Sequence, residues 1–303
     1  MSDSVLALAL SSSVLSSLTP ILGSALRKNE KSYNSSVYVI GMEPEDGDPH
    51  RLLDQAPLLD ATRERPLDRS QLQHELDISR STAYRRTSSL KEDGLLDQTP
   101  AGYQTTGAGC AVADAVEQFE RSVKAIDRLE PLLAELSEPE LTRNVHLFAD
   151  ADVFTATPAN PNEPIDEWVE HFEYFERFRG TVVAGCPPAV TEQGVEHAQS
   201  DVDFEAICSP LALQADKNAS QEAFETIAGA DSLSLYTHPA PPFTMGIIDD
   251  VVIIIAFDED TSLPVASITT TNPLAREWAE DLYRRYRRDA DTRGVTEMES
   301  STR

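Results

Sequence analysis

The stretch DRSQLQHELDISRSTAYRRTSSLKEDGLLDQTPAGYQT, residues 68–105, decides the fold of the first half of the chain. Its apolar residues recur at helical spacing in two short segments, and the three residues 77–79 separate these segments as a tight turn. Asp68 is placed to cap the earlier helix, and either Ser79 or Ser81 is placed to cap the later one. The later helix carries Ala83, Tyr84, Thr87 and Leu90 and stops at Gly94.

Segments on either side of this helix pair extend the unit. Upstream, the apolar pattern from His50 predicts a first helix, and Pro57 is expected either to kink that helix or to mark its start. Downstream, Leu95–Gln98 and Tyr103–Thr106 are expected to form two strands joined by a turn. Three helices followed by a hairpin are the arrangement of a winged helix-turn-helix, with the hairpin as the wing.

The later helix of the pair carries an unusual local charge. Arg80, Arg85, Arg86 and Lys91 give it +4, and no acidic residue follows Ser79 until Glu92. Helices of this kind place their N-terminal residues at base edges in the major groove of double-stranded DNA. The sequence therefore predicts DNA contacts from the recognition helix and the wing, made by Ser79, Arg80, Ser81, Thr82, Arg85, Arg86, Lys91, Gln98 and Tyr103. The alternatives are a solvated helical subdomain and a winged helix that binds only protein.

The whole chain has a formal net charge of −27, which opposes binding to a polyanion. One interpretation is an acidic protein that avoids nucleic acid. The other is a halophilic, archaeal-type protein from a salt-rich cytoplasm, where about 1 M salt screens charges beyond roughly 3 Å. Only five of the 25 basic residues are lysines, and an acidic, lysine-poor composition favours the second interpretation.

The first 41 residues differ from the rest in composition. They carry a net charge of +1, and a serine cluster lies inside an apolar stretch, whereas an acidic segment opens at Met42. A secretory signal would need its basic residues before the apolar stretch, and here they follow it. We expect residues 1–41 to be either a disordered extension or not part of the native protein, whose translation would then begin at Met42.

Other sequence features narrow the class of protein. No stretch approaches the roughly 20 apolar residues of a membrane span. The three cysteines are widely spaced, which argues against a disulfide framework or a structural zinc site. We therefore expect a cytoplasmic protein that binds no membrane and needs no metal or other cofactor.

The remainder of the chain divides into three parts by pattern. After the winged helix-turn-helix at residues 42–106, residues 107–137 form a helical linker in which Val112, Val116, Phe119, Val123, Ile126 and Leu133 follow a heptad-like seam. This seam fits either a homodimer interface or a helix that packs on its own second domain. Residues 138–290 alternate strands and helices, and residues 291–303 are expected to be a disordered tail. The predicted fold class is α+β overall, with an α/β domain built on a mixed sheet.

Within residues 138–290 the pattern predicts individual elements. The predicted strands are 145–148, 153–155, 181–184, 204–208, 233–236, 245–248, 251–257 and 265–269, and the predicted helices are 165–178, 192–199, 220–227 and 273–288. The segment 251–257, VVIIIAF, is a buried strand because it is short, β-branched and bounded by aspartates.

No catalytic pattern appears in this domain. His171 and Glu173 match half of a zinc-deaminase motif, but no P-C-x-x-C follows them. None of the six histidines has a lysine two residues later, as a phospholipase-type site requires, and G-x-S-x-G and H-E-x-x-H are absent. We therefore expect a protein that is not an enzyme. The candidates for a small-molecule pocket are polar or aromatic residues near strand ends, namely Tyr236, His238, Phe243 and Asp249.

From about Met42 to Asp289 the sequence resembles the haloarchaeal winged-helix transcription regulators with a methanogenesis-regulator-type second domain. The resemblance rests on the join from Leu90 to Leu96, on PPFTMGIIDDVVIIIAFDED at 241–260 and on REWAEDLYRRYRRDA at 276–290. It implies a sensor or dimerisation domain of phospholipase-D-like lineage without catalytic residues. The expected function is a dimeric DNA-binding transcription regulator with an unidentified effector. The alternatives are a winged-helix scaffold for protein contacts and an α/β enzyme with an accessory winged helix.

Overall fold

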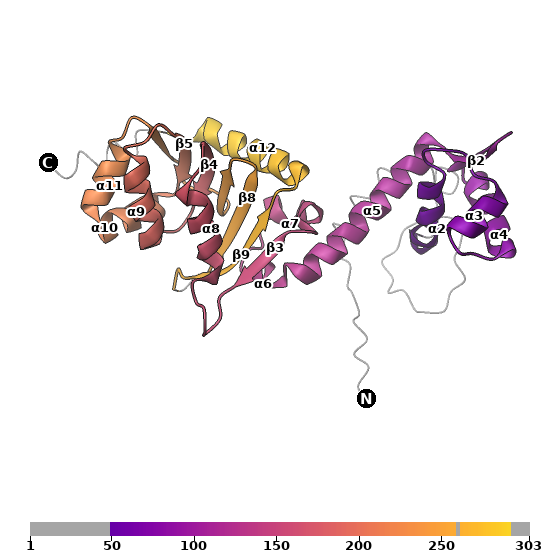
Figure 1. The fold of residues 1–303 in the computed structure, drawn as a ribbon, viewed down its shortest axis with the longest axis horizontal. Helices are drawn as coiled ribbons and strands as arrows, with labels where there is room; N and C mark the ends of the chain where they lie inside the picture. Colours follow the sequence, from indigo (N-terminus) through magenta and orange to yellow (C-terminus); the bar gives the residue numbers. More distant parts are fainter. Residues whose placement is uncertain (1–48, 259–260, 292–303) are drawn as a thin grey trace, which may run out of the picture. The chain divides into compact units, whose positions relative to one another are not determined.

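The computed structural model describes residues 49–258 and 261–291 (Figure 1). These residues form two compact units that divide between Glu120 and Arg121, inside a long helix, and each unit is described by itself. The predictions for residues 1–41 and for the end of the chain after Asp291 lie outside the described residues. None of the described helices combines the length and the apolar character needed to cross a membrane.

The first unit is a winged helix-turn-helix, as predicted. Its elements are α2 (Pro49–Ala61), α3 (Arg69–Glu75), α4 (Arg80–Glu92), β1 (Leu96–Thr99), β2 (Gly102–Thr105) and the first part of α5 (Gly107–Arg128). Helix α2 begins at Pro49 and runs through Pro57, so Pro57 does not mark its start. The core contains Leu58, Leu59, Leu67, Leu72, Leu90, Leu96 and Val112.

Local side-chain chemistry sets the ends of α3 and α4. The Asp68 carboxylate accepts hydrogen bonds from the backbone N–H groups of Ser70 and Gln71, and the Gln71 side chain accepts from the N–H of Asp68. Ser79 caps α4 by accepting from the N–H of Thr82 at 3.1 Å. Gly94 follows the end of α4 with φ +73°, a conformation that glycine adopts without strain.

The second unit is built on a seven-stranded mixed sheet in the order β3-β9-β8-β7-β4-β5-β6. Strands β4, β5 and β6 are parallel, and the remaining neighbours are antiparallel. The strands are β3 (Asp152–Thr155), β4 (Arg177–Val182), β5 (Asp203–Cys208), β6 (Leu233–Thr237), β7 (Thr244–Ile248), β8 (Val251–Phe257) and β9 (Pro264–Thr270).

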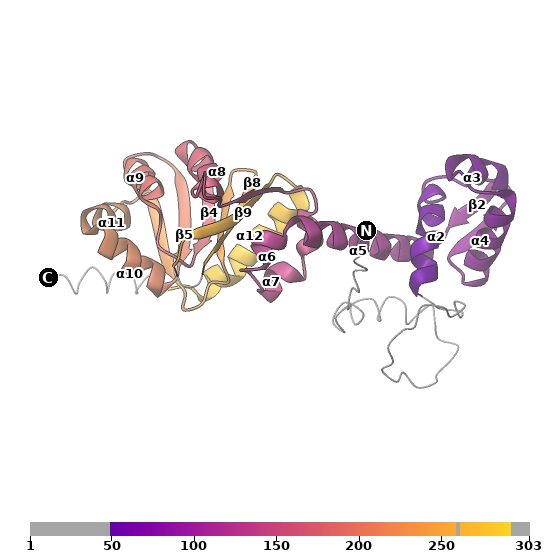
Figure 2. The same ribbon diagram turned by 90° about the horizontal axis from the view of Figure 1, so that it is seen from below.

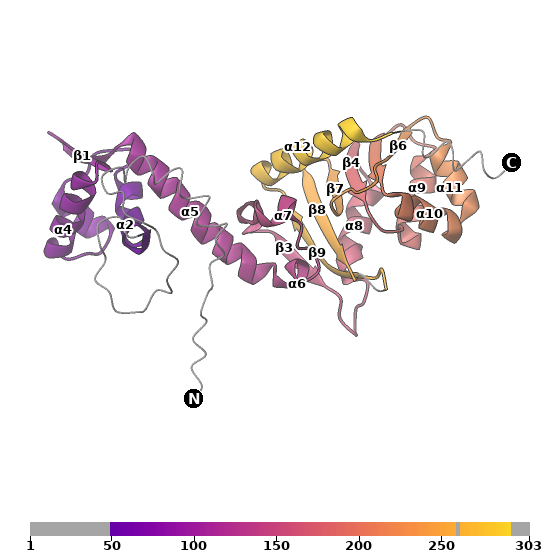
Figure 3. The same ribbon diagram turned by 180° about the vertical axis from the view of Figure 1, so that it is seen from behind.

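Helices cover both faces of this sheet. They are α6 (Glu130–Leu133), α7 (Pro139–Thr142), α8 (Glu163–Glu173), α9 (Pro188–His197), α10 (Pro210–Ala219), α11 (Gln221–Ala228) and α12 (Pro273–Asp289). Figure 2 shows α8 and α9 on one side of the sheet and α6, α7 and α12 on the other. Figure 3, from behind, shows α12 lying across the sheet, where it contacts β4, β7 and β8.

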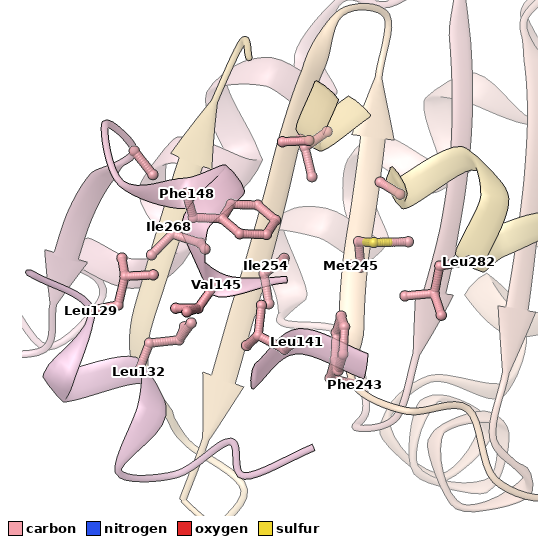
Figure 4. Packing of buried hydrophobic residues seen from close by; sticks show 14 of the residues in the cluster. Leu129, Leu132, Leu141, Val145, Phe148, Phe243, Met245, Ile254, Ile268 and Leu282 are labelled. Atoms are coloured by element: carbon pink, nitrogen blue, oxygen red, sulfur yellow. The ribbon is translucent and has the colours of Figure 1, made fainter. Parts of the chain in front are cut away.

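Strand β8 contributes to the cores on both faces, which explains its unbroken apolar run. Val252, Ile254 and Ala256 belong to the core under α12, and Ile253 and Ile255 belong to the core under α8. Figure 4 shows the first of these cores, where Ile254 lies near Leu141, Val145 and Phe148.

Several predicted elements differ from the observed ones. Val145–Phe148, predicted as a strand, is a 3₁₀ turn because Val145 and Phe148 both face the core at a spacing of three. The helix predicted through Phe178 ends at Glu173, and Phe178 lies in β4. Helix α10 was not predicted. The predicted helical linker of residues 107–137 breaks at Leu129, between α5 and α6, and α6 ends at Leu133.

Candidate nucleic-acid interface

Helix α4 is held by a narrow inner stripe, which leaves most of its surface open. Ala83, Thr87 and Leu90, at helical spacings of four and three, are buried, and Thr87 donates a hydrogen bond to the Ala83 carbonyl at 2.8 Å. The predicted residues Ser79, Arg80, Ser81, Arg85 and Lys91 are exposed, whereas Thr82 is half-buried. These six residues therefore share one helix and its capping turn.

Arg85 and Arg86 occupy different positions on this helix. Arg85 is exposed on the outer face, one turn from Ser81. Arg86 is half-buried at the edge near Ser89, whose hydroxyl accepts a hydrogen bond from Arg51 of α2 at 2.6 Å. Arg85 thus points to solvent more fully than its neighbour.

Ion pairing separates the arginines of this unit into two groups. Arg51 pairs with Asp93 at 2.7 Å, Arg63 pairs with Asp114 at 2.7 Å, and Arg65 pairs with Glu75. Within the described residues, Arg80, Arg85 and Arg86 form no ion pair. Their charge is therefore not neutralised by described neighbours, and it stands at the surface of a strongly acidic protein.

Two further residues extend this face, and the sequence reading did not include them in the site. Tyr84 is 59 % exposed, although it lies beside the buried Ala83. The guanidinium of Arg69, from α3, stacks over the Tyr84 ring at 4.5 Å from its centroid. For Tyr84 the sequence carried a signal in the helical wheel of α4. On that wheel Tyr84 falls next to Arg80 and Lys91. It lies away from the stripe formed by Ala83, Thr87 and Leu90.

The wing is a two-stranded hairpin tied to the rest of the unit. Lys91 at the end of α4 donates a hydrogen bond to the Gln98 side chain of β1 at 3.0 Å, so two predicted contact residues are brought together. Tyr103, also predicted to contact DNA, is only 5 % exposed and belongs to the core, where Arg69 lies 5.1 Å from its ring centroid. Its backbone pairs with Leu67 through two hydrogen bonds, so Tyr103 supports the wing from within.

The four residues predicted to line a ligand pocket do not lie together. Phe243 is fully buried and stacks on Trp278 at 6.4 Å between ring centroids. Tyr236 lies under the Arg287 guanidinium, and His238 meets the edge of Tyr286, so these three residues contact α12.

Asp249 lies apart from the other three, in the tight turn between β7 and β8. Its φ is +52°, and its carboxylate accepts a hydrogen bond from the N–H of Arg177 at 2.9 Å. This arrangement secures the turn. None of the four residues lines the apolar cavity that the second unit contains between α8–α11 and β4–β6.

Comparison with known proteins agrees with this domain plan. Residues 47–128 match the HVO_A0261 N-terminal domain, and residues 161–289 match the middle domain of the methanogenesis regulatory protein FilR1. No curated protein sequence matches the chain.

Solved structures give only remote similarities. TrmBL2, described as an archaeal chromatin protein with a novel mode of DNA binding, is 12 % identical over 79 % of this chain and 93 % of its own, with a TM-score of 0.37. Nuc from Salmonella typhimurium, a phospholipase D family member, is 15 % identical over 46 % of this chain and 95 % of its own, with a TM-score of 0.38. NucT from Helicobacter pylori is 9 % identical over 47 % of this chain and 98 % of its own, with a TM-score of 0.37.

The two domain matches together cover more than half of the sequence, in the order in which the two units occur. The chain therefore carries an HVO_A0261-type N-terminal domain followed by a methanogenesis-regulator-type middle domain.

Proposed function

We propose that this protein is a transcription regulator that binds double-stranded DNA through α4 and the wing. The observation that carries the proposal is the set of arginines without an ion-pair partner among the described residues, Arg80, Arg85 and Arg86, on a helix whose buried residues form a single inner stripe. The guanidinium group suits both guanine edges and phosphates. A scaffold that only binds protein, or an α/β enzyme with an accessory winged helix, would give these three residues no such role.

A binding assay on the protein's own promoter, in molar potassium salt, tests this proposal. The double variant Arg85→Ala with Arg86→Ala should weaken binding at least about tenfold, because each lost contact is worth about 1–3 kcal/mol. Arg85→Ala alone should have the larger effect of the two single substitutions, since Arg86 is half-buried. Arg65→Ala is the matched control: it removes an exposed arginine that pairs with Glu75, outside α4. Unchanged binding by the double variant would refute the interface.

We further infer that the regulator is a homodimer joined through α5. Val112, near the start of this helix, is 4 % exposed and belongs to the core of the first unit. Val116, one turn later, is 8 % exposed. The same stripe continues through Phe119, Val123 and Ile126, of which the last two are 37 % and 51 % exposed.

The second unit covers a different face of α5. Ala125 and Leu129 are fully buried in its core, and Lys124 and Arg128 form ion pairs with Asp150 and Asp152. The stripe through Val123 and Ile126 lies on the other side of the helix, at heptad-like spacings of three and four. A second copy of α5 fits this stripe because the same spacing recurs in both partners, and two recognition helices would raise specificity.

Sedimentation analysis of the full chain tests the dimer. The wild type should be dimeric at micromolar concentration, and Val123→Glu with Ile126→Glu should be monomeric. Leu211→Glu is the control, because Leu211 is an equally apolar side chain, 73 % exposed, on α10. A monomeric wild type, or a dimer that survives the double substitution, would refute this interface.

We assign the reception of a signal to the second unit. An effector can change DNA binding only if it binds two states of the protein with different affinity. This role requires a ligand-binding site but no catalytic residues. It is consistent with the sequence, in which no histidine has a lysine two residues later, as a phospholipase-type site requires.

A further inference from the structure

A cavity lies inside the second unit, between the layer formed by α8–α11 and strands β4, β5 and β6. The cavity itself has a volume of about 80 Å³; all the space between its walls that protein atoms leave free, counted together with the part open to solvent, is about 760 Å³. Its walls come from four helices and three strands that follow one another along the chain, from α8 to β6. Protein interiors are normally packed as densely as organic crystals, so unfilled space in a core is exceptional.

The walls of the cavity are mainly aromatic and aliphatic. They include Trp168, Phe172, Phe178, Phe204, Phe224 and Leu213. Several of these rings contact one another; Phe178 and Phe204, for example, stack at 4.7 Å between centroids. No lysine or arginine lines the cavity. A bound carboxylate or phosphate would meet no lysine or arginine, and the Nε2 of the lining His197 already lies 2.7 Å from the Phe172 carbonyl oxygen. Burying such a group unpaired is strongly unfavourable.

One carboxylate lines the cavity. Asp216 on α10 accepts a hydrogen bond from the backbone N–H of Cys186 at 2.6 Å, and it is half-buried. Burial raises the pKa of Asp216, while hydrogen bonds from Cys186 act in the opposite direction. An acceptor beside apolar walls favours a partner that brings a hydroxyl or amine donor.

Trp168 adds a second polar feature. The side chain lines the cavity and is 4 % exposed. Its indole N–H is buried and has no hydrogen-bond acceptor within the described part of the chain. Buried donors without an acceptor are rare, and an oxygen atom on a bound molecule would remove that cost.

We propose that this cavity binds a compact, mainly aromatic small molecule that is uncharged or cationic, with a hydroxyl or amine directed to Asp216. The cavity excludes carboxylates and phosphates. This proposal names the class of molecule that the second unit would sense. Only the effect of that molecule on DNA binding rests on the proposed function. Binding itself follows from the cavity's shape and chemistry.

Calorimetry on the full chain with three small probes of similar size tests the proposed class of ligand. 4-Methylphenol and 2-phenylethylamine should bind with dissociation constants below about 1 mM, a modest affinity for molecules of their size. Phenylacetate should bind at least tenfold more weakly, because its carboxylate finds no cation. The proposal would be overturned if phenylacetate bound as tightly as the other two probes, or if neither 4-methylphenol nor 2-phenylethylamine bound.

Variants locate the site. Val190→Phe fills the cavity from α9 and should abolish binding of both probes, and Thr191→Phe, at a half-buried lining position, is a second blocking variant with little risk to folding. Asp216→Asn should weaken 2-phenylethylamine at least tenfold and change 4-methylphenol by less than about threefold. Full binding by both blocking variants in folded protein would show that the probes bind elsewhere, and would overturn the proposal.

Fluorescence separates this test from that of the proposed function. The chain has two tryptophans, so Trp278→Phe leaves Trp168, in the cavity wall, as the single reporter. A change in its emission on adding 4-methylphenol supports the site, whether or not DNA binds. An unchanged emission at saturating probe would overturn the assignment. DNA affinity, measured with and without the probe, reports separately on the sensing role.

Discussion

At the scale of single residues, the three cysteines differ in their surroundings. Cys110 on α5 is half-buried, whereas Cys208 in β5 is 5 % exposed. Burial, followed by the charge of Asp216, raises the pKa of the Cys208 thiol to about 12. The pKa of Cys186 is also raised well above its ordinary value, chiefly by burial. The two cysteines of the cavity are therefore protected from chemistry that needs a thiolate.

A thiol-reactive probe at pH 8 should detect this difference. A thiol of pKa 12 is about 0.01 % ionised at that pH, against roughly a quarter for a thiol of pKa 8.5. The native protein should show one rapidly reacting thiol, which Cys110→Ser removes, and all three should react after denaturation. Two or more rapid thiols in the native protein would contradict the raised thiol pKa values of Cys186 and Cys208.

At the scale of elements, the wing depends on one glycine. Gly102 has φ +136°, and a Cβ atom there would lie 2.5 Å from the backbone carbonyl carbon of Leu67. The close approach allows Leu67 and Tyr103 to exchange two backbone hydrogen bonds at 3.0 and 2.8 Å. A larger residue would have to displace backbone, which is rigid.

We expect Gly102→Ala to destabilise the first unit by about 2 kcal/mol or more, because both strain and displacement act. Hydrogen exchange should show lost protection in β1, β2 and α3. Tryptophan fluorescence should keep its unfolding midpoint, since Trp168 and Trp278 both lie in the second unit. Gly94→Ala is the control: its φ is +73°, but no atom lies within 4 Å of the added carbon, so the loss should be smaller. Equal losses would show that the Leu67 contact is unimportant.

At the scale of the whole molecule, the net charge opposes the proposed function. The formal net charge of −27 is unfavourable both for the compact protein and for binding to DNA, whereas the proposed function requires the arginines of α4 to attract DNA. Raising the salt concentration from about 0.1 M to 1 M shortens the screening length from roughly 10 Å to 3 Å. Long-range repulsion is thereby suppressed more than contacts at hydrogen-bond distance.

We therefore expect stability to rise with potassium chloride, with a melting temperature higher by about 10 °C or more at 2 M than at 0.1 M. DNA affinity, measured by fluorescence anisotropy, should hold or rise between about 0.2 and 1 M. An ordinary basic regulator loses affinity steeply over that range as counterions are released. A steep continuous fall, together with a melting temperature independent of salt, would contradict a salt-adapted protein.

The sequence predicted the winged helix-turn-helix well because its signals are local. Asp68, Ser79 and Gly94 determine helix ends through hydrogen bonds and backbone freedom within a few residues. Predictions failed where long-range packing decides. Val145–Phe148 has the composition of a strand, yet it turns so that two of its side chains reach the core under α12. Phe178 follows the aromatic helix closely in the sequence, yet it lies in β4. There it pairs with Phe204 of β5 and Ile248 of β7, which come 26 and 70 residues later.

The amino-acid sequence by itself determined helix α4, its Ser79 cap and its local positive charge, since each depends on neighbours along the chain. Only the tertiary structure decided which of these residues face solvent. It buried Tyr103, exposed Tyr84 and left Val123 and Ile126 uncovered. It also placed the cavity among Trp168, Phe204 and Asp216, which lie on three elements. Exposure and cavities depend on how distant segments pack, and no pattern along one segment encodes that packing.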